Sequence, residues 1–343
     1  MKAIAKARPE PGLDIVDVDE PQVRQGCVKL RVERASICGT DLHIYNWDAW
    51  SSERIKPPRI IGHEFCGTIT EVGEGVDDRK VGDFVASESH IVDGTCRLCK
   101  LGLRHLCENT QILGVDVDGG FAPYAVVPAM NARLTSEIVP KSVACMQDAI
   151  GNAVHTVMRG PVEGCKILIT GLGPIGLFAA AICKALGAGK VYATEVSDYR
   201  IALAEQLGVD VVLNPMKDEV HKVLEEMEPH GFDATLEMSG HPGSLDLAIE
   251  RTRPGGRVSM LGLYSDRLRF IDMNKVIFKG LDLQGIVGRR IWETWDQMHW
   301  LFTEKALDLS AVVTHEMHFT QIEEAMRTLK AGEAGKIVMS FEE

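Results

Sequence analysis

The spacing of apolar and polar residues changes character near residue 150. Before that point, short alternating runs are interrupted by glycine and proline, as in CVKLRVE (27–33), CGTITEVG (66–73), GDFVASES (82–89) and FAPYAVVPA (121–129). A two-residue period is typical of strands, and glycine and proline mark the turns between them. This part of the chain is therefore predicted to be a β-rich, barrel-like domain.

After residue 150, short apolar runs alternate with helical ones. The six runs that we expect to be strands are KILIT, KVYATE, VVLN, ATLEMS, RVSML and LDLQGI, and helical runs such as PIGLFAAAICKALG and DYRIALAEQLG separate the first three. Strands that are joined by helical crossovers form a doubly wound parallel sheet. The chain is thus predicted to be an α/β protein with a six-stranded Rossmann domain beside the β-rich one.

The residues after 292 are too few to form a domain of their own easily. Because GKIVMSF (335–341) has the pattern of a strand, we expect this end of the chain to return to the N-terminal sheet. The expected domains are residues 1–147 together with 293–343, and residues 148–292.

Composition narrows the class of protein. The chain has 343 residues, of which 45% are hydrophobic and 25% charged, and no apolar stretch approaches the roughly 20 residues that span a bilayer. A net charge of -12 disfavours binding to nucleic acid. The first 30 residues lack the apolar core of an export signal, so we expect a cytoplasmic protein.

The nine cysteines are expected to be thiols or metal ligands, because the cytosol keeps thiols reduced. Four of them lie in contexts typical of metal sites. We expect the other five to be small buried apolar residues: Cys27, Cys66, Cys145, Cys165 and Cys183.

A glycine-rich turn follows the first strand of the second domain. In KILITGLGPIG, Gly171, Gly173 and Gly176 lie between an apolar strand and a helix, with Pro174 in its first turn. Such glycines let the backbone approach a pyrophosphate at the helix N-terminus. The next strand ends in Glu195, whose carboxylate can accept hydrogen bonds from a ribose 2'-hydroxyl and repels a 2'-phosphate. NAD is therefore favoured over NADP.

Arg200 lies close to Glu195 in the sequence and could pair with a 2'-phosphate. We expect instead that it lies at the edge of the adenosine or on the surface, because Glu195 is present.

Two runs in the first domain, ICGTDLH and IIGHEFCG, contribute Cys38, Thr40, His43, His63 and Glu64. Thiolate and imidazole ligands favour zinc at neutral pH, and zinc with an open position can hold a substrate oxygen as a Lewis acid. If the carboxylate of Glu64 takes the place of a second thiolate, the metal has a harder oxygen ligand. Such a ligand can exchange with water or substrate. The chain is predicted to be a metal-assisted redox enzyme.

Together these motifs resemble the zinc-containing medium-chain alcohol dehydrogenases along essentially the whole chain. Longer strings resemble the threonine-oxidising members of that family, namely HIYNWDAW (43–50), GNAVHT (151–156) and GRRIWETW (288–295). The resemblance implies that the β-rich domain is GroES-like, that the cofactors are NAD and a catalytic Zn²⁺, and that the protein is a homotetramer.

By this resemblance, Cys38 and His63 hold the catalytic zinc, and Glu64 is a ligand or a close partner. Asp148 matches a further acidic position that approaches the metal or assists proton transfer, although a helix N-cap is the alternative. Thr40 and His43 match a relay that passes the substrate proton from a hydroxyl, by way of the cofactor ribose, to an imidazole. His43 is otherwise a structural imidazole.

A second set of possible ligands lies in DGTCRLCKLGLRHLC, where the family has four cysteines that hold a structural zinc. This chain has Asp93 at the first position, followed by Cys96, Cys99 and Cys107. A carboxylate oxygen can coordinate zinc, so a site of three cysteines and one aspartate is possible. If the lobe holds no zinc, packing must support it and its thiols become vulnerable to oxidation.

Other positions match substrate and cofactor contacts of the family. His90 could meet the amino or carboxylate end of the substrate, or else be a capping or surface histidine. Arg289 and Arg290 could reach the substrate carboxylate, although surface charge is the safer interpretation for at least one. The residues expected near the nicotinamide, or else simple strand ends, are Ile175, Gly262, Leu263, Tyr264, Ile286 and Val287.

The resemblance implies that the β-hydroxyl of L-threonine is oxidised to a ketone, giving L-2-amino-3-oxobutanoate and NADH. A polyol or secondary-alcohol dehydrogenase of the same superfamily is the first alternative, and the threonine-type strings argue against it. A non-catalytic dinucleotide-binding protein is the second, but such a protein would be expected to lose the metal ligands or relay groups that this chain retains.

Overall fold

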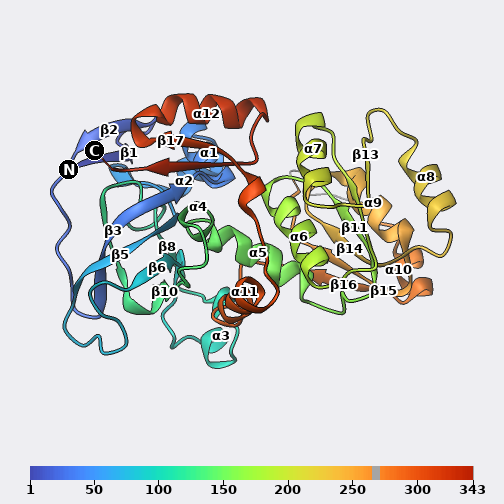
Figure 1. Cartoon of the computed structure of the whole chain (residues 1–343), viewed down its shortest axis with the longest axis horizontal. Coiled ribbons are helices and arrows are strands. Elements are labelled where there is room, and N and C mark those ends of the chain that lie inside the picture. The colour runs from blue at the N-terminus through green and yellow to red at the C-terminus, as the bar shows by residue number, and fades with distance from the viewer. Residues whose placement is uncertain (265–270, 343) are drawn as a thin grey trace. The chain divides into compact units, whose positions relative to one another are not determined.

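The computed structural model describes residues 1–264 and 271–342. Contacts divide the chain into two compact units (Figure 1), which are Met1–Ala149 with Arg290–His299 and Val313–Glu343, and Ile150–Arg289 with Trp300–Val312. The sequence had placed residues 293–343 entirely in the first unit, whereas residues 300–312 group with the second. The apolar Leu301, Leu307, Leu309 and Val312 are buried, so this segment has its own core-facing residues.

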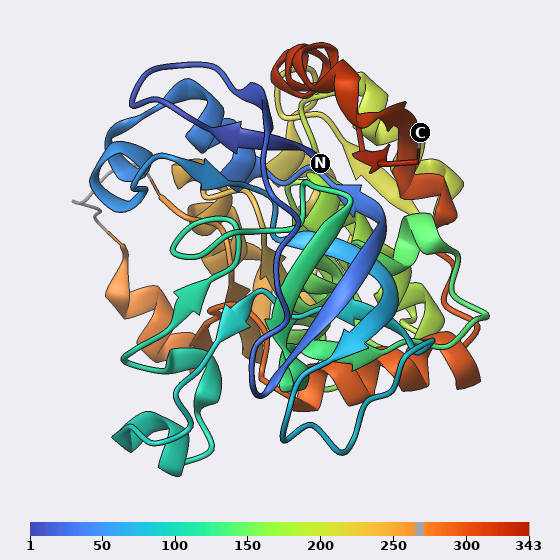
Figure 2. The same ribbon diagram turned by 90° about the vertical axis from the view of Figure 1, so that its left-hand side faces the viewer.

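The first unit is built on a seven-stranded sheet. Its strand order is β10-β6-β5-β3-β18-β17, and β9 also pairs with β3. Figure 2 shows β3 and β5 side by side, and they pair antiparallel from Val28 to Ser36 with register shifts at Lys29/Leu30 and Val32/Arg34. The strands are β3 (Cys27–Ser36), β5 (Glu64–Val72), β6 (Phe84–Ser87), β9 (Tyr124–Pro128), β10 (Ala132–Leu134), β17 (Val313–His318) and β18 (Lys336–Ser340).

The C-terminal strand joins this sheet, as predicted. Strand β18 pairs antiparallel with β3 through Val338 and Ser36, and parallel with β17. Ile337, Val338 and Met339 are all buried, so this run of three apolar residues is covered on both faces of the strand. The core of the unit also buries Val28, Leu30 and Val32 of β3.

Smaller elements complete the first unit. The short strands are β1 (Lys2–Lys6), β2 (Asp14–Asp17) and β4 (Arg59–Ile60) in one sheet, and β7 (His90–Ile91) with β8 (Gln111–Ile112) in another. The helices are α1 (Gly39–Asn46), α2 (Ala49–Arg54), α3 (Arg97–Lys100), α4 (Lys141–Ala144) and α12 (Ile322–Ala331), with 3-10 turns η1 (Arg104–Leu106), η2 (Ala129–Asn131) and η4 (Phe319–Gln321). Helices α5 (Gln147–Val157) and α11 (Glu293–Glu304) begin in the first unit and end in the second.

The second unit is the predicted doubly wound sheet. Its order is β13-β12-β11-β14-β15-β16, and every neighbouring pair is parallel. Numbered from the first strand of the unit, this is the order 3-2-1-4-5-6 of a Rossmann domain. The strands are β11 (Lys166–Thr170), β12 (Lys190–Thr194), β13 (Val211–Leu213), β14 (Phe232–Glu237), β15 (Thr252–Met260) and β16 (Asp282–Gly285).

Helices connect these strands, and all six strand predictions are confirmed. The helices are α6 (Pro174–Ala185), α7 (Asp198–Gln206), α8 (Val220–Met227), α9 (Pro242–Arg251) and α10 (Met273–Lys279), and a 3-10 turn, η3, covers Ser310–Val312. Pro174 occupies the first position of α6, where its missing N–H leaves no bond unmade.

Two properties of the described residues bear on the expectations above. No helix in residues 1–264 and 271–342 is both long and apolar enough to cross a membrane. All nine cysteines are free thiols. Cys66, Cys145 and Cys183 are buried as expected, but Cys27 and Cys165 are only half-buried, because each lies at a strand end rather than inside a core.

Candidate active site

A first cluster of possible metal ligands forms where β3 and β5 lie side by side. Cys38 is the N-cap of α1, two residues after β3, and His63 and Glu64 lie at the start of β5. The strand pairing sets Glu64 opposite Ser36. One ligand atom from each of Cys38, His63 and Glu64 lies within 4.8 Å of the others.

The donor atoms in this cluster are suited to a cation. Glu64 Oε2 accepts hydrogen bonds from Ser36 Oγ and Lys336 Nζ, whereas Glu64 Oε1 and His63 Nδ1 are buried without a hydrogen-bond partner. A buried polar atom that lacks a partner costs about 1–3 kcal/mol. A zinc ion held by Cys38, His63 and Glu64 would give Glu64 Oε1 a partner and offset its share of that cost, so the residues present fit the metal.

The charges around His63 also favour a cation at this site. Burial alone would lower the pKa of His63, but the neighbouring Cys38 and Asp41 outweigh it and raise the pKa to about 10. Burial raises the pKa of the fully buried Asp41, and the neighbouring His63 opposes this shift. The cluster therefore stabilises positive charge at its centre, as a site for a divalent cation must.

Asp41 and Lys336 are parts of this cluster that the sequence did not reveal. Asp41 is fully buried, its Oδ2 accepts a hydrogen bond from Cys38 N at 2.8 Å, and its Oδ1 lies 3.9 Å from His63 Nδ1. A carboxylate behind a ligating histidine is a common support in metal sites. Its place in ICGTDLH, between Thr40 and His43, was the available signal.

Lys336 lies on β18 and pairs with Glu64 although 272 residues separate them. Its ammonium also donates to Ile37 O at 3.0 Å. Burial raises the pKa of Glu64, but Lys336, His63 and Ser36 together outweigh it, so the net pKa is lowered. Lys336 thus keeps Glu64 ionised, and only its position in an otherwise apolar strand could have hinted at this.

The two predicted relay residues lie on α1. The Cys38 thiol donates to Thr40 Oγ1 at 3.8 Å, which sets the Thr40 hydroxyl beside the metal cluster. His43 lies three residues further on, on the same side of the helix, with its side chain 62% exposed. Their catalytic roles remain predictions.

His43 has a partner that the sequence did not reveal. Its Nδ1 lies 2.5 Å from Asp48 Oδ2, and the ring also contacts Trp50 edge-on. Asp48 is itself fixed, because its Oδ1 caps α2 by accepting from Ser51 N at 2.9 Å. A fixed carboxylate orients the imidazole and leaves Nε2 for proton transfer.

We expect Asp48→Asn to lower kcat by about 10-fold or more, as part of the 10²–10⁴ that a positioned proton-transfer group contributes. Asparagine is as good an N-cap as aspartate, so α2 should persist. The measurement is kcat and KM with zinc content and NAD affinity on the same samples. Glu53→Gln, which alters an exposed acid in the same helix, is the matched control. A variant with unchanged kcat, or one that changes only KM, would remove Asp48 from the relay.

Asp148 and His90 lie outside the group formed by Cys38, His63 and Glu64. Asp148 is buried in the first turn of α5, and its Oδ1 accepts a hydrogen bond from Ser89 N at 2.8 Å. Because α5 begins at Gln147, the alternative that Asp148 is a helix N-cap is wrong. His90 is half-buried, and its backbone N–H donates to Glu88 Oε1 at 2.8 Å. The catalytic roles of both residues stay predictions.

The glycine turn of the second unit has the geometry that a pyrophosphate needs. Gly171 has a φ of 92°, and a Cβ on Gly176 would lie 2.1 Å from Gly171 O. Gly173 is the N-cap of α6, whose first turn contains the half-buried Ile175. Only glycine fits at Gly171 and Gly176, so this turn leaves backbone N–H groups open to a ligand.

Glu195 lies directly beside that turn. Its Oε2 accepts from Leu172 N at 2.8 Å, and its Oε1 accepts from Val196 N and Ser197 N. Arg200 Nε lies 3.6 Å from Glu195 Oε1. The carboxylate and the guanidinium therefore lie together at the end of β12, where the sequence placed the ribose.

The remaining positions differ in their surroundings. A Cβ on Gly262 would lie 2.1 Å from Gly240 N, and Tyr264 donates to Glu237 Oε2 at 2.8 Å. Leu263 and Val287 are exposed, whereas Ile286 is buried. The contacts of Gly262 and Tyr264 fix the chain after β15. The contacts of all these residues with the nicotinamide remain predictions.

The two arginines take different places. Arg290 pairs on the surface with Glu293 at 3.1 Å, as expected for at least one of them. Arg289 is almost fully buried, donates to Asn152 Oδ1 at 3.2 Å and packs against Gly151.

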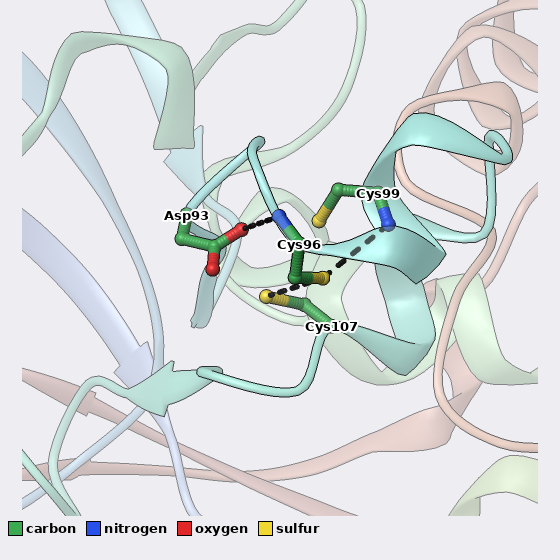
Figure 3. Close-up of side chains that lie close together, drawn as sticks. All are labelled: Asp93, Cys96, Cys99 and Cys107. Carbon is green, nitrogen blue, oxygen red and sulfur yellow. Dashed lines mark hydrogen bonds between the residues drawn. The ribbon is translucent and has the colours of Figure 1, made fainter.

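The second ligand set is also brought together (Figure 3). Ligand atoms of Asp93, Cys96, Cys99 and Cys107 lie within 4.8 Å of one another, and the Cys96 and Cys107 sulfurs are 4.0 Å apart. The pKa of Asp93 is held well below its usual range, first by the Asn109 amide and then by backbone N–H groups. Burial raises the pKa of Cys99 to about 12.

Comparisons with known proteins agree with this arrangement. Residues 24–137 match the family model of the alcohol dehydrogenase GroES-like domain, and residues 174–304 match that of the zinc-binding dehydrogenases. The L-threonine 3-dehydrogenase of Pyrococcus abyssi is 46% identical over 340 residues, which cover 98% of each chain.

Solved structures support the fold along its whole length. The short chain alcohol dehydrogenase rspB from E. coli CFT073, solved in complex with NADH, and the 2R,3R-butanediol dehydrogenase of Bacillus subtilis are each 28% identical with a TM-score of 0.90, over 99% of both chains. The chain therefore belongs to the zinc-containing medium-chain dehydrogenases and, within them, to the L-threonine 3-dehydrogenase family.

Proposed function

We propose that the protein oxidises the β-hydroxyl of L-threonine, with NAD as the hydride acceptor and zinc as the metal, to give L-2-amino-3-oxobutanoate and NADH. The observation that carries the proposal is the cluster of Cys38, His63 and Glu64, in which the buried Glu64 Oε1 lacks a hydrogen-bond partner. The 46% identity to the Pyrococcus abyssi enzyme supports threonine as the substrate.

When bound, zinc would polarise the substrate oxygen and lower the pKa of its hydroxyl. The protein supplies the rest from its own side chains. Cys38, His63 and Glu64 would hold the ion, and Lys336 and Ser36 keep Glu64 in place. Asp148, which the family resemblance implied near the metal, would approach the metal or assist proton transfer.

Proton removal falls to Thr40 and His43. The Thr40 hydroxyl, beside the Cys38 sulfur, would accept the substrate proton and release its own without becoming charged. His43, oriented by Asp48, would take up that proton and pass it to water, to which its ring is exposed. His90 would contact the amino or carboxylate end of threonine.

The dinucleotide is proposed to bind at the glycine turn of the second unit. Gly171, Gly173 and Gly176 would face its pyrophosphate, and Glu195 would accept from the ribose hydroxyls. A carboxylate at that position repels a 2'-phosphate, so NADP should support slower turnover than NAD. Six residues are proposed to contact the nicotinamide: Ile175, Gly262, Leu263, Tyr264, Ile286 and Val287.

Dialysis against a chelator is expected to abolish threonine-dependent NADH formation and to leave NAD binding largely intact, because the metal and dinucleotide sites use different residues. The assay follows NADH absorbance, and calorimetry measures NAD binding before and after metal removal. Added zinc should restore activity. If turnover survives with no metal bound, the mechanism is wrong.

The same assay separates the alternatives. A polyol or secondary-alcohol dehydrogenase would turn over sorbitol or 2,3-butanediol faster than threonine. A non-catalytic protein would bind NAD and a full complement of zinc but oxidise no alcohol. The threonine-type relatives, at much higher identity than the butanediol dehydrogenase, favour the first proposal.

We further propose a homotetramer that works in the cytoplasm. Strand β16 is the edge of its sheet, and the neighbouring Ile277 and Phe278 of α10 are 66% and 86% exposed. An open strand edge with exposed apolar side chains favours association. Free thiols at all nine cysteines suit a reducing compartment. Sedimentation that gives the mass of a single chain would contradict the tetramer.

A further inference from the structure

The segment from Asp93 to Cys107, called the Asp93 lobe below, has three thiols and one carboxylate around a common centre. Cys99 and Cys107 are buried, Cys96 is half-buried, and Asp93 is the most exposed of the four. Figure 3 shows all four side chains directed toward one another from α3 and the turns beside it. Ligand atoms within 4.8 Å of one another are close enough to share one tetrahedral ion.

The Asp93 carboxylate is held in place by groups of the same lobe. Its Oδ1 accepts from Thr95 N at 2.8 Å and Cys96 N at 3.0 Å, and its Oδ2 accepts from Asn109 Nδ2. A carboxylate has about four acceptor positions, and a further contact of Asp93 is with the Cys99 side chain, which is itself one of the four possible ligands. Hydrogen bonds of this kind orient a ligating carboxylate in metal sites.

Packing gives this lobe little support without a metal. Within residues 1–264 and 271–342, its apolar cluster consists of Val92, Cys99, Cys107 and Ile291, with Cys96 and Trp292 packed against it. Three of these six members are the sulfur ligands themselves. A lobe whose core is made of ligands depends on the bond between those ligands and an ion.

We propose that the Asp93 lobe is an exchangeable zinc site, in which Cys96, Cys99 and Cys107 hold the ion and Asp93 is the fourth ligand and the first to be released. A carboxylate carries the same charge as a thiolate, but its oxygen is harder and matches zinc less well than sulfur. Closed structural sites use sulfur and imidazole for this reason. Because Asp93 is also the exposed member, water and chelators reach the metal from its side.

The proposal does not rest on the oxidation of threonine, and its test measures the metal directly. The zinc-loaded full-length protein is mixed with excess 4-(2-pyridylazo)resorcinol, and zinc transfer is followed by absorbance. We expect two zinc ions per chain, one of which is lost in a phase that Cys96→Ser abolishes. Asp93→Cys should slow that phase by at least about tenfold, because changes even beyond the direct ligands alter zinc affinity 10- to 100-fold.

Two further variants keep the test decisive. Asp93→Asn preserves the acceptor for Thr95 and Cys96 but removes the charge, so it should release zinc faster than the wild type. Asp77→Cys places a thiol at another exposed aspartate and should leave the phase unchanged. One zinc per chain that is insensitive to Cys96→Ser would overturn the proposal, as would equal release rates for the wild type and Asp93→Cys.

Cobalt provides a second readout. With Co²⁺ in place of zinc, the thiolate-to-cobalt charge-transfer absorption from the lobe should increase by roughly one third in Asp93→Cys, since three thiolate ligands become four. Cys96→Ser, which is expected to leave the lobe without a metal, should remove this absorption. An absorption that Asp93→Cys does not change would mean that position 93 is not a ligand.

Discussion

Replacing Thr40 with valine is expected to lower kcat for threonine oxidation by about 10²–10⁴, the usual contribution of a positioned proton-transfer group. Valine has the shape of threonine without the hydroxyl, so the path that begins beside the Cys38 sulfur loses its first member. The measurement is the steady-state rate of NADH formation, together with zinc content and NAD affinity.

Two controls make this result interpretable. Thr40→Ser restores a hydroxyl and should recover most of the rate. Thr70→Val removes a hydroxyl that bonds to Lys29 O at 3.3 Å, outside the proposed path, and should have little effect. If Thr40→Val retains more than about a tenth of the wild-type kcat, then proton transfer does not depend on Thr40.

Replacing Lys336 with methionine is expected to lower the free energy of unfolding of the zinc-free protein by about 3–5 kcal/mol, the usual cost of removing one partner of a buried ion pair. Lys336 and Glu64 are 3% and 1% exposed, and their pair is completed by Ser36 Oγ and Ile37 O. Without Lys336, Glu64 keeps its burial but loses the opposite charge. Denaturant unfolding of the metal-free protein measures the change.

The double variant Lys336→Met with Glu64→Gln tests the cause. It removes both charges, so it should regain most of the stability that the single variant loses. The loss should also be smaller in zinc-loaded protein, because the cation offsets the charge of Glu64. A double variant as unstable as the single one would show that Lys336 acts through packing of its alkyl chain rather than through Glu64.

The pattern of the sequence was sufficient for most of the fold. A two-residue period predicted β3, β5, β6 and β9, and buried runs between helical segments predicted all six strands of the second unit. GKIVMSF was correctly predicted to return to the N-terminal sheet as β18. These predictions succeed because periodicity reports which face of an element is buried.

The division of residues 290–312 was not predictable in the same way. The end of the chain was assigned to one unit as a block, whereas residues 300–312 group with the other. Apolar residues such as Leu301 and Leu309 show that the segment is buried, but periodicity does not tell which of two cores receives them.

The sequence predicted the residues that could ligate the metal, but it did not reveal the neighbouring residues that hold them in place. Cys38, His63 and Glu64 were visible because thiol, imidazole and carboxylate groups in short motifs are unusual combinations. Asp41 and Asp48 lie inside one of those motif regions but look like ordinary surface acids in the sequence. Their roles depend on burial beside His63 and on the capping of α2, which are tertiary properties.

By itself, the sequence determined the two kinds of domain, the glycine turn with Glu195, and the two sets of side chains that could ligate a metal, because spacing along the chain encodes local geometry. Only the tertiary structure decided that Lys336 neutralises Glu64, that Asp48 orients His43, and that Asn109 holds Asp93. Lys336 is 272 residues from its partner. The pairing of β18 with β3, and of β3 with β5, brings the two charges together where water cannot separate them.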